Sequence, residues 1–474
     1  MKKILSNLYI KMALVIFAIM CLVICFYNIT GTEHQIINIL YVIFILVIIL
    51  IINKKIYAKI KNPNKLIIVN LLLFLILTII SAILFRVEYN WDVKWVMDSA
   101  KEIVEKGTNS NVDYFKMCQN NIPILCVEVI ACKLAFGNEI GAYILNILCI
   151  FFSAVFAVLI AKKIKGNSMA LNTSLLLLLC TPLYLNAPII YSDAVALLFP
   201  TVIFYMWLIF KEKLNKIEKM NKSIIIYWLI FSIIACIAYI IKPTAFIAFI
   251  AIFIDLFLKF KKYLRYIAIF GIIFIIFNIT YSNIVTRYII KDEKENELAR
   301  PNTHYFMMGL NRPKEYGGDA NGWGSYNDVD VNITGSEPTY EKKKAKNIEV
   351  IKQRLANYGL YGYLSFLKHK FVYTWAEDST IGVMQNINWD TVNTNNIFYD
   401  IIIGKYSKTI YMPFANAYYT LLFILILISA ILEFKNKNID IINMQSACIG
   451  LAIFLLSWEA CARYIYVLVP VFCI

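Results

Sequence analysis

The stretch LIIVNLLLFLILTIISAILF (66–85) leads directly into RVEYNWDVKWVMDSAKEIVEK (86–106), and these two segments decide the fold. The first is an apolar run that is long enough to cross a bilayer. In the second, apolar residues recur at helical spacing from Val93 to Val104, with charged residues between them. Such a helix is expected to lie along the membrane surface and to end at Gly107. The stretch therefore predicts a membrane-spanning chain with a surface helix where this span ends.

Asp92 lies at the beginning of the predicted surface helix, at the depth of the lipid headgroups. An acidic side chain in this place suits a base that acts on a membrane-embedded substrate. The alternative is that Asp92 caps the helix, as aspartate often does. This stretch alone leaves both interpretations open.

The composition is that of an integral membrane protein. Hydrophobic residues make up 60% of the chain and charged residues 16%, and the mean hydropathy is +0.66. The apolar runs predict about twelve spans. The first run is long and lacks a small-residue cleavage site, so we expect it to remain as a helix. The predicted spans are 12–28, 36–52, 66–85, 141–161, 169–186, 194–210, 223–241, 245–258, 266–284, 412–432, 441–457 and a run that begins at Tyr464.

The net charge of +15 follows the topology of the chain. Lysine and arginine gather in alternate short loops, at 54–65, 162–165, 211–222, 259–265 and 435–437. The opposite short loops hold almost no cations, with Lys242 and Arg463 as the exceptions. By the positive-inside rule, the N-terminus is cytoplasmic in a multi-pass protein of the plasma membrane. The excess of basic residues is explained by topology and therefore gives no support to a nucleic-acid partner.

Cofactor motifs are absent from the sequence. Most of the 11 cysteines lie in apolar runs, and no cysteine pair has metal-ligand spacing with any of the 3 histidines. No Walker loop or glycine-rich dinucleotide motif occurs. The sequence therefore implies no cofactor firmly, and it leaves a divalent cation open.

The predicted fold class is an all-α polytopic membrane protein with outer-face surface helices and a mixed outer loop domain. We expect a two-span N-terminal region (1–65), a membrane core (66–284) with a first outer loop (86–140), a large outer region (285–411) and C-terminal spans (412–474). A second surface helix is expected at 122–136. The outer region is far longer than a connector needs, and helices are expected there at 338–358 and 361–372, separated by Gly359.

Further charged candidates lie on the same outer side. Asp193 stands at the head of a span, where a carboxylate is a functional candidate by default, although a helix cap is the alternative. Lys242 faces outward against the charge bias, which favours an anionic partner. Arg463 follows Glu459 at i, i+4 spacing, so a helix-surface ion pair is the alternative to a binding role.

Several short motifs follow one another through most of the chain from Arg86 onward. They are Asn90-Trp91-Asp92, Tyr114-Phe115, Asn120-Asn121, Ala135-Phe136-Gly137, Tyr191-Ser192-Asp193, Lys242-Pro243-Thr244, HYFMMGL at 304–310, and Trp458-Glu459 with Arg463-Tyr464. In this order and topology they resemble GT-C glycosyltransferases, specifically the bacterial multi-span relatives of protein O-mannosyltransferases and aminoarabinose transferases. No single motif is specific, and the order supports the resemblance.

The resemblance implies a polyprenyl-phosphate-linked sugar as donor and an acceptor glycan, lipid or protein on the outer face, next to membrane lipids. It implies Asp92 as the catalytic acid/base residue and Asp193 as a second active-site carboxylate. Where relatives have a cation and a proline before the Asn-Asn pair, this chain has Met117, Cys118 and Gln119, so Lys116 is the nearest cation. The expected donor-phosphate residues are Arg463, Lys242, Arg86 and Lys116. The expected substrate-binding residues are His304, Glu459, Asn120 and Asn121.

The chemistry favours the same activity. Outside the cell there is no pool of nucleotide sugars, so a sugar would arrive on a lipid carrier. A phosphate leaving group needs cations, and the acceptor hydroxyl needs a base whose pKa is raised by partial desolvation. The predicted function is therefore glycosyl transfer with Asp92 as general base. The alternatives are a lipid-linked glycan flippase or other transporter, which usually has charges near mid-membrane, and a non-catalytic scaffold for envelope assembly.

Overall fold

A computed structural model describes residues 2–31, 35–52, 54, 62–86, 89–216, 222–258, 260–290, 297–383 and 397–474. The basic-loop residues 55–61 and 217–221 and the segment 384–396 of the outer region lie outside it. Every regular element of the described residues is a helix, and the isolated bridge between Pro313 and Ala320 is their one strand-like pairing. The predicted all-α class is confirmed.

Eight helices in the described part of the chain are long and apolar enough to cross a membrane. They belong to α1 (Lys2–Thr30), α3 (Pro63–Leu84), α7 (Ile140–Leu179), α9 (Ser192–Asn215), α10 (Lys222–Ile241), α12 (Phe260–Ile284), α18 (Met412–Asn436) and α19 (Ile439–Ser457). Shorter apolar helices are α2 (Gln35–Ile51), α11 (Pro243–Leu258) and the pair η8 (Ala462–Leu468) and α20 (Val469–Phe472). Gly166, at a positive φ of 78°, kinks α7 and divides it into the two apolar stretches that the sequence predicts.

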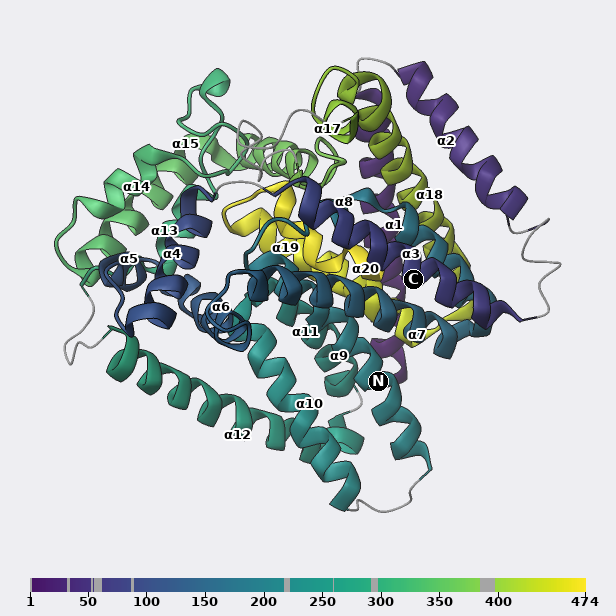
Figure 1. Ribbon diagram of the computed structural model, residues 1–474, viewed down its shortest axis with the longest axis horizontal. Coiled ribbons are helices and arrows are strands. Elements are labelled where there is room, and N and C mark those ends of the chain that lie inside the picture. The colour runs from purple at the N-terminus through teal and green to yellow at the C-terminus, as the bar shows by residue number, and fades with distance from the viewer. Residues whose placement is uncertain are drawn as a thin grey trace.

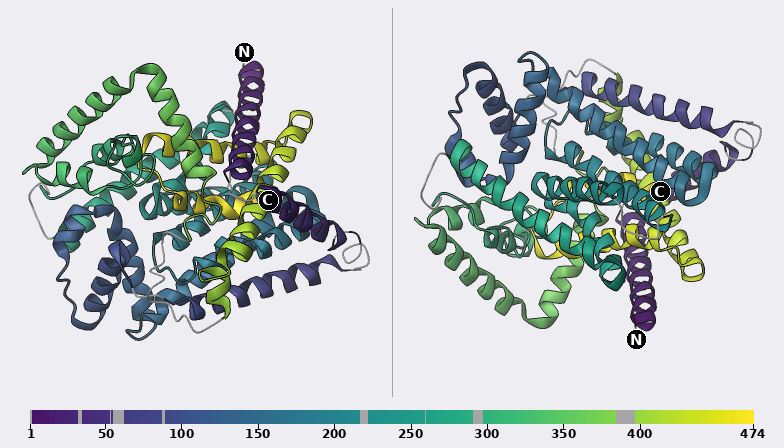
Figure 2. Two further views of the ribbon diagram at one scale, coloured as in Figure 1. Left: turned by 90° about the horizontal axis from the view of Figure 1, so that it is seen from above. Right: turned by 90° about the horizontal axis from the view of Figure 1, so that it is seen from below.

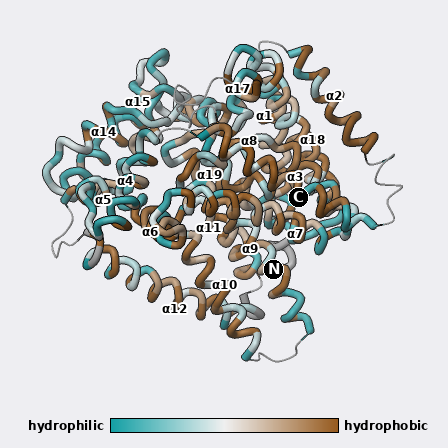
Figure 3. Tube along the Cα trace, in the orientation of Figure 1, coloured by the Kyte–Doolittle hydropathy of each residue, from teal (hydrophilic) through white to brown (hydrophobic). Residues whose placement is uncertain are grey.

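The spans pack into one hydrophobic core. α7 lies against α3 and α9, α1 against α18, and α11 against α19. Trp207, Trp228, Phe231 and Phe249 are fully buried at the centre. Large apolar side chains such as Ile83 and Ile276 are exposed on the outside of the bundle, as expected for helices that face lipid. Figure 3 shows these brown, hydrophobic segments filling most of the molecule.

The helices of the first outer loop and the first helices of the outer region gather at one end of the molecule. They are α4 (Trp91–Lys106), α5 (Val112–Met117), η3 (Gln119–Asn121), α6 (Ile122–Leu134), α13 (Asn302–Met308), η5 (Lys314–Tyr316), α14 (Asp328–Gly335) and α15 (Tyr340–Trp375). The outer region ends in α17 (Ile397–Ile402) and η7 (Ser407–Tyr411), which lie near α18 instead (Figure 1). Dark blue α4 and α5 lie beside green α13–α15 in Figure 1, and both views of Figure 2 place them at the same end. The division of the chain into four regions stays a prediction.

Glycines end or bend the polar helices as the sequence predicts. Gly107 closes α4 in the left-handed conformation (φ 70°), and its N–H donates to the carbonyl of Ile103. Gly359 (φ 56°) kinks α15 between the two predicted helices. The predicted second surface helix is present as α6, but its Glu128 is fully buried. One face of α6, which carries Glu128, therefore packs against its neighbours, which include α4 and α7, while Ile130 and Leu134 stay exposed.

A buried lysine forms hydrogen bonds that join the outer region to the turn between α19 and η8. The Lys370 ammonium of α15 donates to the carbonyls of Gly309 (2.6 Å), Trp458 (2.6 Å) and Leu456 (3.1 Å). Burial lowers the pKa of Lys370 to about 7. A Cβ at Gly309 would lie 2.6 Å from the Trp458 carbonyl, so the close approach requires glycine. This contact holds the polar end of the molecule against the end of a span.

Candidate active site

Asp92 faces two tyrosine hydroxyls from the first turn of α4. Tyr114 donates to Asp92 Oδ1 at 2.6 Å, and the Tyr191 hydroxyl lies 3.3 Å from Asp92 Oδ2. The N-cap of α4 is Asn90, whose side chain makes no capping bond. The Asp92 carboxylate therefore points into a polar cluster, and this favours the functional interpretation over the helix cap.

Asn121 completes the hydrogen-bond network around Asp92. Its amide nitrogen donates to the Tyr114 hydroxyl at 2.5 Å, and its oxygen accepts from Tyr191 at 2.7 Å. A hydroxyl has one proton to donate, and the shorter contact assigns the Tyr191 proton to Asn121. Oδ2 of Asp92 is then left with only the longer tyrosine contact. Burial, followed by the charge of Asp92, raises the pKa of both tyrosines, so both remain protonated.

Asp193 forms a second centre in the first turn of α9, where it meets two cations. Lys242 donates to its Oδ1, and Arg463 Nε lies 3.8 Å from its Oδ2. The side chains of Asp193, Lys242 and Arg463 are only 8%, 13% and 16% exposed. The sequence did not predict this pairing: it indicated Glu459 as the possible ion-pair partner of Arg463, and the structure places Asp193 in contact with both cations. Lys242 and Arg463 come from turns that are distant in sequence from Asp193. The spacing of these residues along the chain therefore did not indicate the contact.

Aromatic rings connect the two carboxylate centres. The Arg463 guanidinium lies 4.9 Å from the centre of the Trp91 ring and 5.7 Å from that of Tyr191, distances at which cation–π attraction operates. The rings of Trp91 and Tyr191 meet edge to face at 5.5 Å. Trp91 has a positive φ of 40°, a strained conformation that is typical of functional sites. Arg463 thus lies between Asp193 and the N-terminal end of α4, where Asp92 is located.

Glu459 and Asn120 border this cluster. Glu459 Oε1 accepts from the Tyr464 hydroxyl at 3.1 Å; burial raises the pKa of Glu459, while the charge of Arg463 opposes the shift. Asn120 donates to Asn121 at 3.2 Å and accepts from Tyr305 at 3.3 Å. A chain of contacts therefore connects seven of the predicted site residues: Asp92, Asn120, Asn121, Asp193, Lys242, Glu459 and Arg463.

Two predicted phosphate-binding residues have acidic partners of their own. Arg86 forms an ion pair with Glu139 and lies over the Tyr143 ring at 5.2 Å. Lys116 Nζ lies 3.9 Å from the carboxylate of Asp113. The structure does not bring either cation to Asp193, and a phosphate-binding role for them stays a prediction.

His304 is buried in the outer region and bonds to Thr334. The distance from His304 Nδ1 to Thr334 Oγ1 is 2.7 Å, and Thr334 donates its own proton to Asn347 at 2.9 Å. Nδ1 is therefore the donor. Burial, followed by the charge of Arg300, lowers the pKa of His304 to about 4, so the ring is neutral at physiological pH. Its role in substrate binding stays a prediction.

Trp91, Tyr114 and Tyr191 belong to the site but are not among the predicted site residues. Each occurs in a motif beside a predicted residue, and this adjacency is the signal that could have indicated them. Among the described residues, no group of three or more histidine, cysteine, aspartate or glutamate side chains is placed to hold a metal ion.

Comparisons with known proteins agree with a multi-pass membrane protein. A family model described as "conserved hypothetical integral membrane protein" matches residues 1–474, and the chain therefore belongs to this family. No curated protein matches the chain. Among solved structures, the chain is similar to the crystal structure of ArnT from Cupriavidus metallidurans bound to undecaprenyl phosphate. The identity is 11%, the match covers 84% of this chain and 77% of that chain, and the TM-score is 0.39.

Proposed function

We propose that this membrane protein is a GT-C type glycosyltransferase that moves a sugar from a polyprenyl-phosphate donor to an acceptor hydroxyl, with Asp92 as the general base. One observation supports this function above the others. The carboxylate of Asp92 shares a polar cluster with Lys242 and Arg463, two cations that are held by the single carboxylate of Asp193. A base beside cations is what transfer from a phosphate requires.

The donor phosphate would bind at Arg463 and Lys242. Arginine offers a planar fork that can bond two phosphate oxygens, and lysine acts as a compact charge. Both cations have to stay charged to do this. Burial lowers the pKa of Lys242, and the charge of Asp193 opposes this shift. Asp193 thus has the role of the second active-site carboxylate, which orients the two cations.

The transfer step is a displacement at the anomeric carbon of the sugar. The acceptor oxygen forms a bond to that carbon, and the bond from the carbon to the donor phosphate oxygen breaks. The phosphate leaves with the bonding electrons, and the cations stabilise its charge. The acceptor proton passes to Asp92 Oδ2, the oxygen with only the longer tyrosine contact, while Tyr114 holds Oδ1.

The bias of lysines among the short loops supports a site on the outer face, with the N-terminus in the cytoplasm. On that side a lipid carrier can present the sugar. The acceptor is a glycan, a lipid or a protein that reaches the outer surface of the membrane.

Replacing the base tests the function. We expect Asp92→Asn to lower the rate of transfer about 10²- to 10⁴-fold, because the amide keeps the shape of the side chain and loses its basicity. The measurement is the release of polyprenyl phosphate from polyprenyl-phosphate sugars that are added to the purified protein. Asp98→Asn, an exposed carboxylate on the same helix, is the matched control. Near-normal turnover in Asp92→Asn, or lipid movement without transfer in the wild type, would contradict the proposal.

A further inference from the structure

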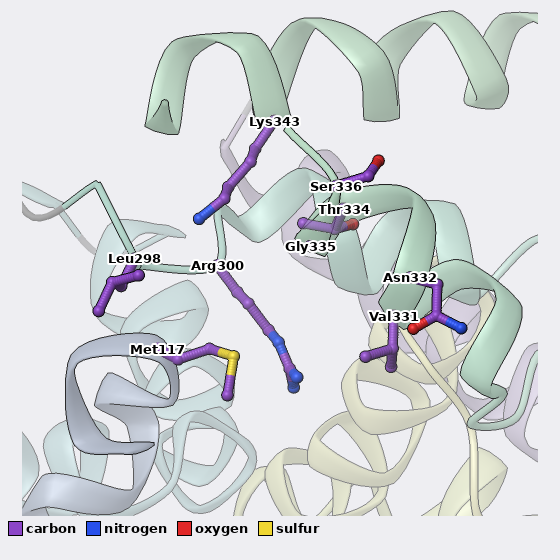
Figure 4. A pocket seen from close by; sticks show the side chains of 9 residues that line it. All are labelled: Met117, Leu298, Arg300, Val331, Asn332, Thr334, Gly335, Ser336 and Lys343. Atoms are coloured by element: carbon purple, nitrogen blue, oxygen red, sulfur yellow. The ribbon is translucent and has the colours of Figure 1, made fainter. Parts of the chain in front are cut away.

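A cavity of about 430 Å³ lies between the first outer loop and the outer region. Figure 4 shows the nine side chains that line it: Met117, Leu298, Arg300, Val331, Asn332, Thr334, Gly335, Ser336 and Lys343. Met117 ends α5, and the other eight residues belong to the outer region around α14 and the first turn of α15. None of the nine belongs to a candidate membrane span. A ligand would therefore reach this cavity from the aqueous side.

The lining contains two cations and no carboxylate. In Figure 4 the Arg300 side chain extends along the cavity, between Met117 and Val331. Lys343 Nζ donates to the carbonyl of Glu297 at 2.5 Å. No described residue accepts a hydrogen bond from the Arg300 guanidinium. Two cations in a lining without a carboxylate give the cavity a positive potential, so the arrangement fits a ligand that brings negative charge.

Hydroxyl and amide groups surround the two cations. Asn332, Thr334 and Ser336 line the same cavity, and the amide of Asn332 can donate to an oxyanion. Planar guanidinium groups are suited to phosphate, whose oxygens can accept two parallel bonds. The cavity therefore offers a planar guanidinium, a compact positive charge and a neutral amide donor, a set of groups that matches a phosphate group.

The cavity adjoins the Asp92 cluster through the chain segment that ends α5. The backbone N–H of Arg300 donates to the Met117 carbonyl at 3.2 Å, and Tyr114, one turn earlier, donates to Asp92. The cavity and the Asp92 cluster therefore share the segment from Tyr114 to Met117.

We propose that this cavity binds a phosphate group of the acceptor, whose hydroxyl then reaches Asp92. The inference rests on the proposed function, and it adds that the acceptor is anionic. The donor phosphate would remain at Lys242 and Arg463, next to the spans, because its lipid chain keeps it at the membrane. The two phosphates occupy different cation pairs, one on the lipid side of Asp92 and one on the aqueous side.

Binding of glycerol 1-phosphate to the purified full-length protein at low salt tests the proposal. We expect Arg300→Gln to weaken this binding at least about tenfold, because it removes a charge-assisted hydrogen-bond donor. Arg300→Lys should retain part of the affinity. The matched control is Lys346→Gln, an exposed lysine of α15 that pairs with Glu349 and should bind like the wild type. No binding to the wild type, or equal binding to Arg300→Gln, overturns the proposal.

A second probe distinguishes the two phosphate sources. A short polyprenyl phosphate should bind Arg300→Gln as it binds the wild type, whereas Arg463→Ala should lose this lipid and keep glycerol 1-phosphate. Loss of the lipid in Arg300→Gln would assign the cavity to the donor and overturn the acceptor assignment. Because both readouts measure binding, they are independent of the turnover lost in Asp92→Asn, and the two proposals can fail separately.

Discussion

Two buried carboxylates with arginine partners, Asp330 in the outer region and Asp193 at the head of α9, are bonded very differently. Asp330 accepts two bonds from Arg354, at 2.6 and 3.0 Å, and one each from Asn311 (3.2 Å) and Asn327 (2.9 Å). Asp193 accepts from Lys242 on one oxygen. Its other oxygen accepts no hydrogen bond within the described part of the chain and has Arg463 at 3.8 Å.

The difference supports a structural role for Asp330 and the proposed ligand-binding role for the Asp193 centre. Around Asp330 one cation meets one carboxylate, and donors on three side chains bond to its two oxygens. Around Asp193 two cations share one carboxylate, and the contact with Arg463 is longer than a hydrogen bond. A saturated pair leaves nothing for a ligand to bond, whereas an unsaturated one retains binding capacity. The number of hydrogen bonds to each carboxylate, more than its burial, therefore distinguishes the two centres and favours the Asp193 centre as the proposed substrate site.

The largest effect should come from breaking the saturated pair. We expect Asp330→Ala to destabilise the fold by about 3–5 kcal/mol, because Arg354 would remain buried without its partner. A thermal unfolding curve in detergent measures the loss, and the exposed Asp319→Ala provides the control. The folded fraction should bind a short polyprenyl phosphate as the wild type does. A change in that affinity would contradict the distinction between the two centres.

A smaller effect, on binding, should follow from removing the arginine of the unsaturated centre. Arg463→Ala is expected to weaken polyprenyl-phosphate binding by about 1.5–3 kcal/mol, roughly 10- to 150-fold. The affinity of Arg463→Lys should lie between those of the wild type and Arg463→Ala, because lysine keeps the charge and loses the planar guanidinium. Affinities measured in matched detergent check the order. Equal affinity in wild type and Arg463→Ala would leave Arg463 as a structural partner of Asp193.

The smallest effect is expected at Lys242. Lys242→Ala should weaken the same binding by less than about tenfold, because a compact charge contributes fewer directed bonds than a guanidinium. Lys242→Arg serves as the charge-retaining control and should restore most of the affinity. If Lys242→Ala were more damaging than Arg463→Ala, the lysine would be the principal phosphate ligand.

The fold could be predicted from local features, because the length of an apolar run and its flanking charges depend only on neighbouring residues. Gly359 and Gly107 were predicted correctly because a left-handed residue is a local requirement. Asp92 and Asp193 were selected because acidic residues at membrane depth are rare. The partner of Arg463 was not predicted, because Asp193 reaches it only through tertiary packing. Tyr114 and Tyr191 were missed because 31 tyrosines give no single one a compositional signal.

The buried ammonium of Lys370 imposes an order on the biosynthesis of the protein. Two of its three carbonyl acceptors, those of Leu456 and Trp458, emerge from the ribosome long after Lys370 itself. Lys370 therefore has all three acceptors only after translation has passed Trp458, and Asp193 has both its cations only after translation has passed Arg463. The contacts that join the outer region to the end of α19, and those that complete the Asp193 centre, form only when almost the whole chain has been made.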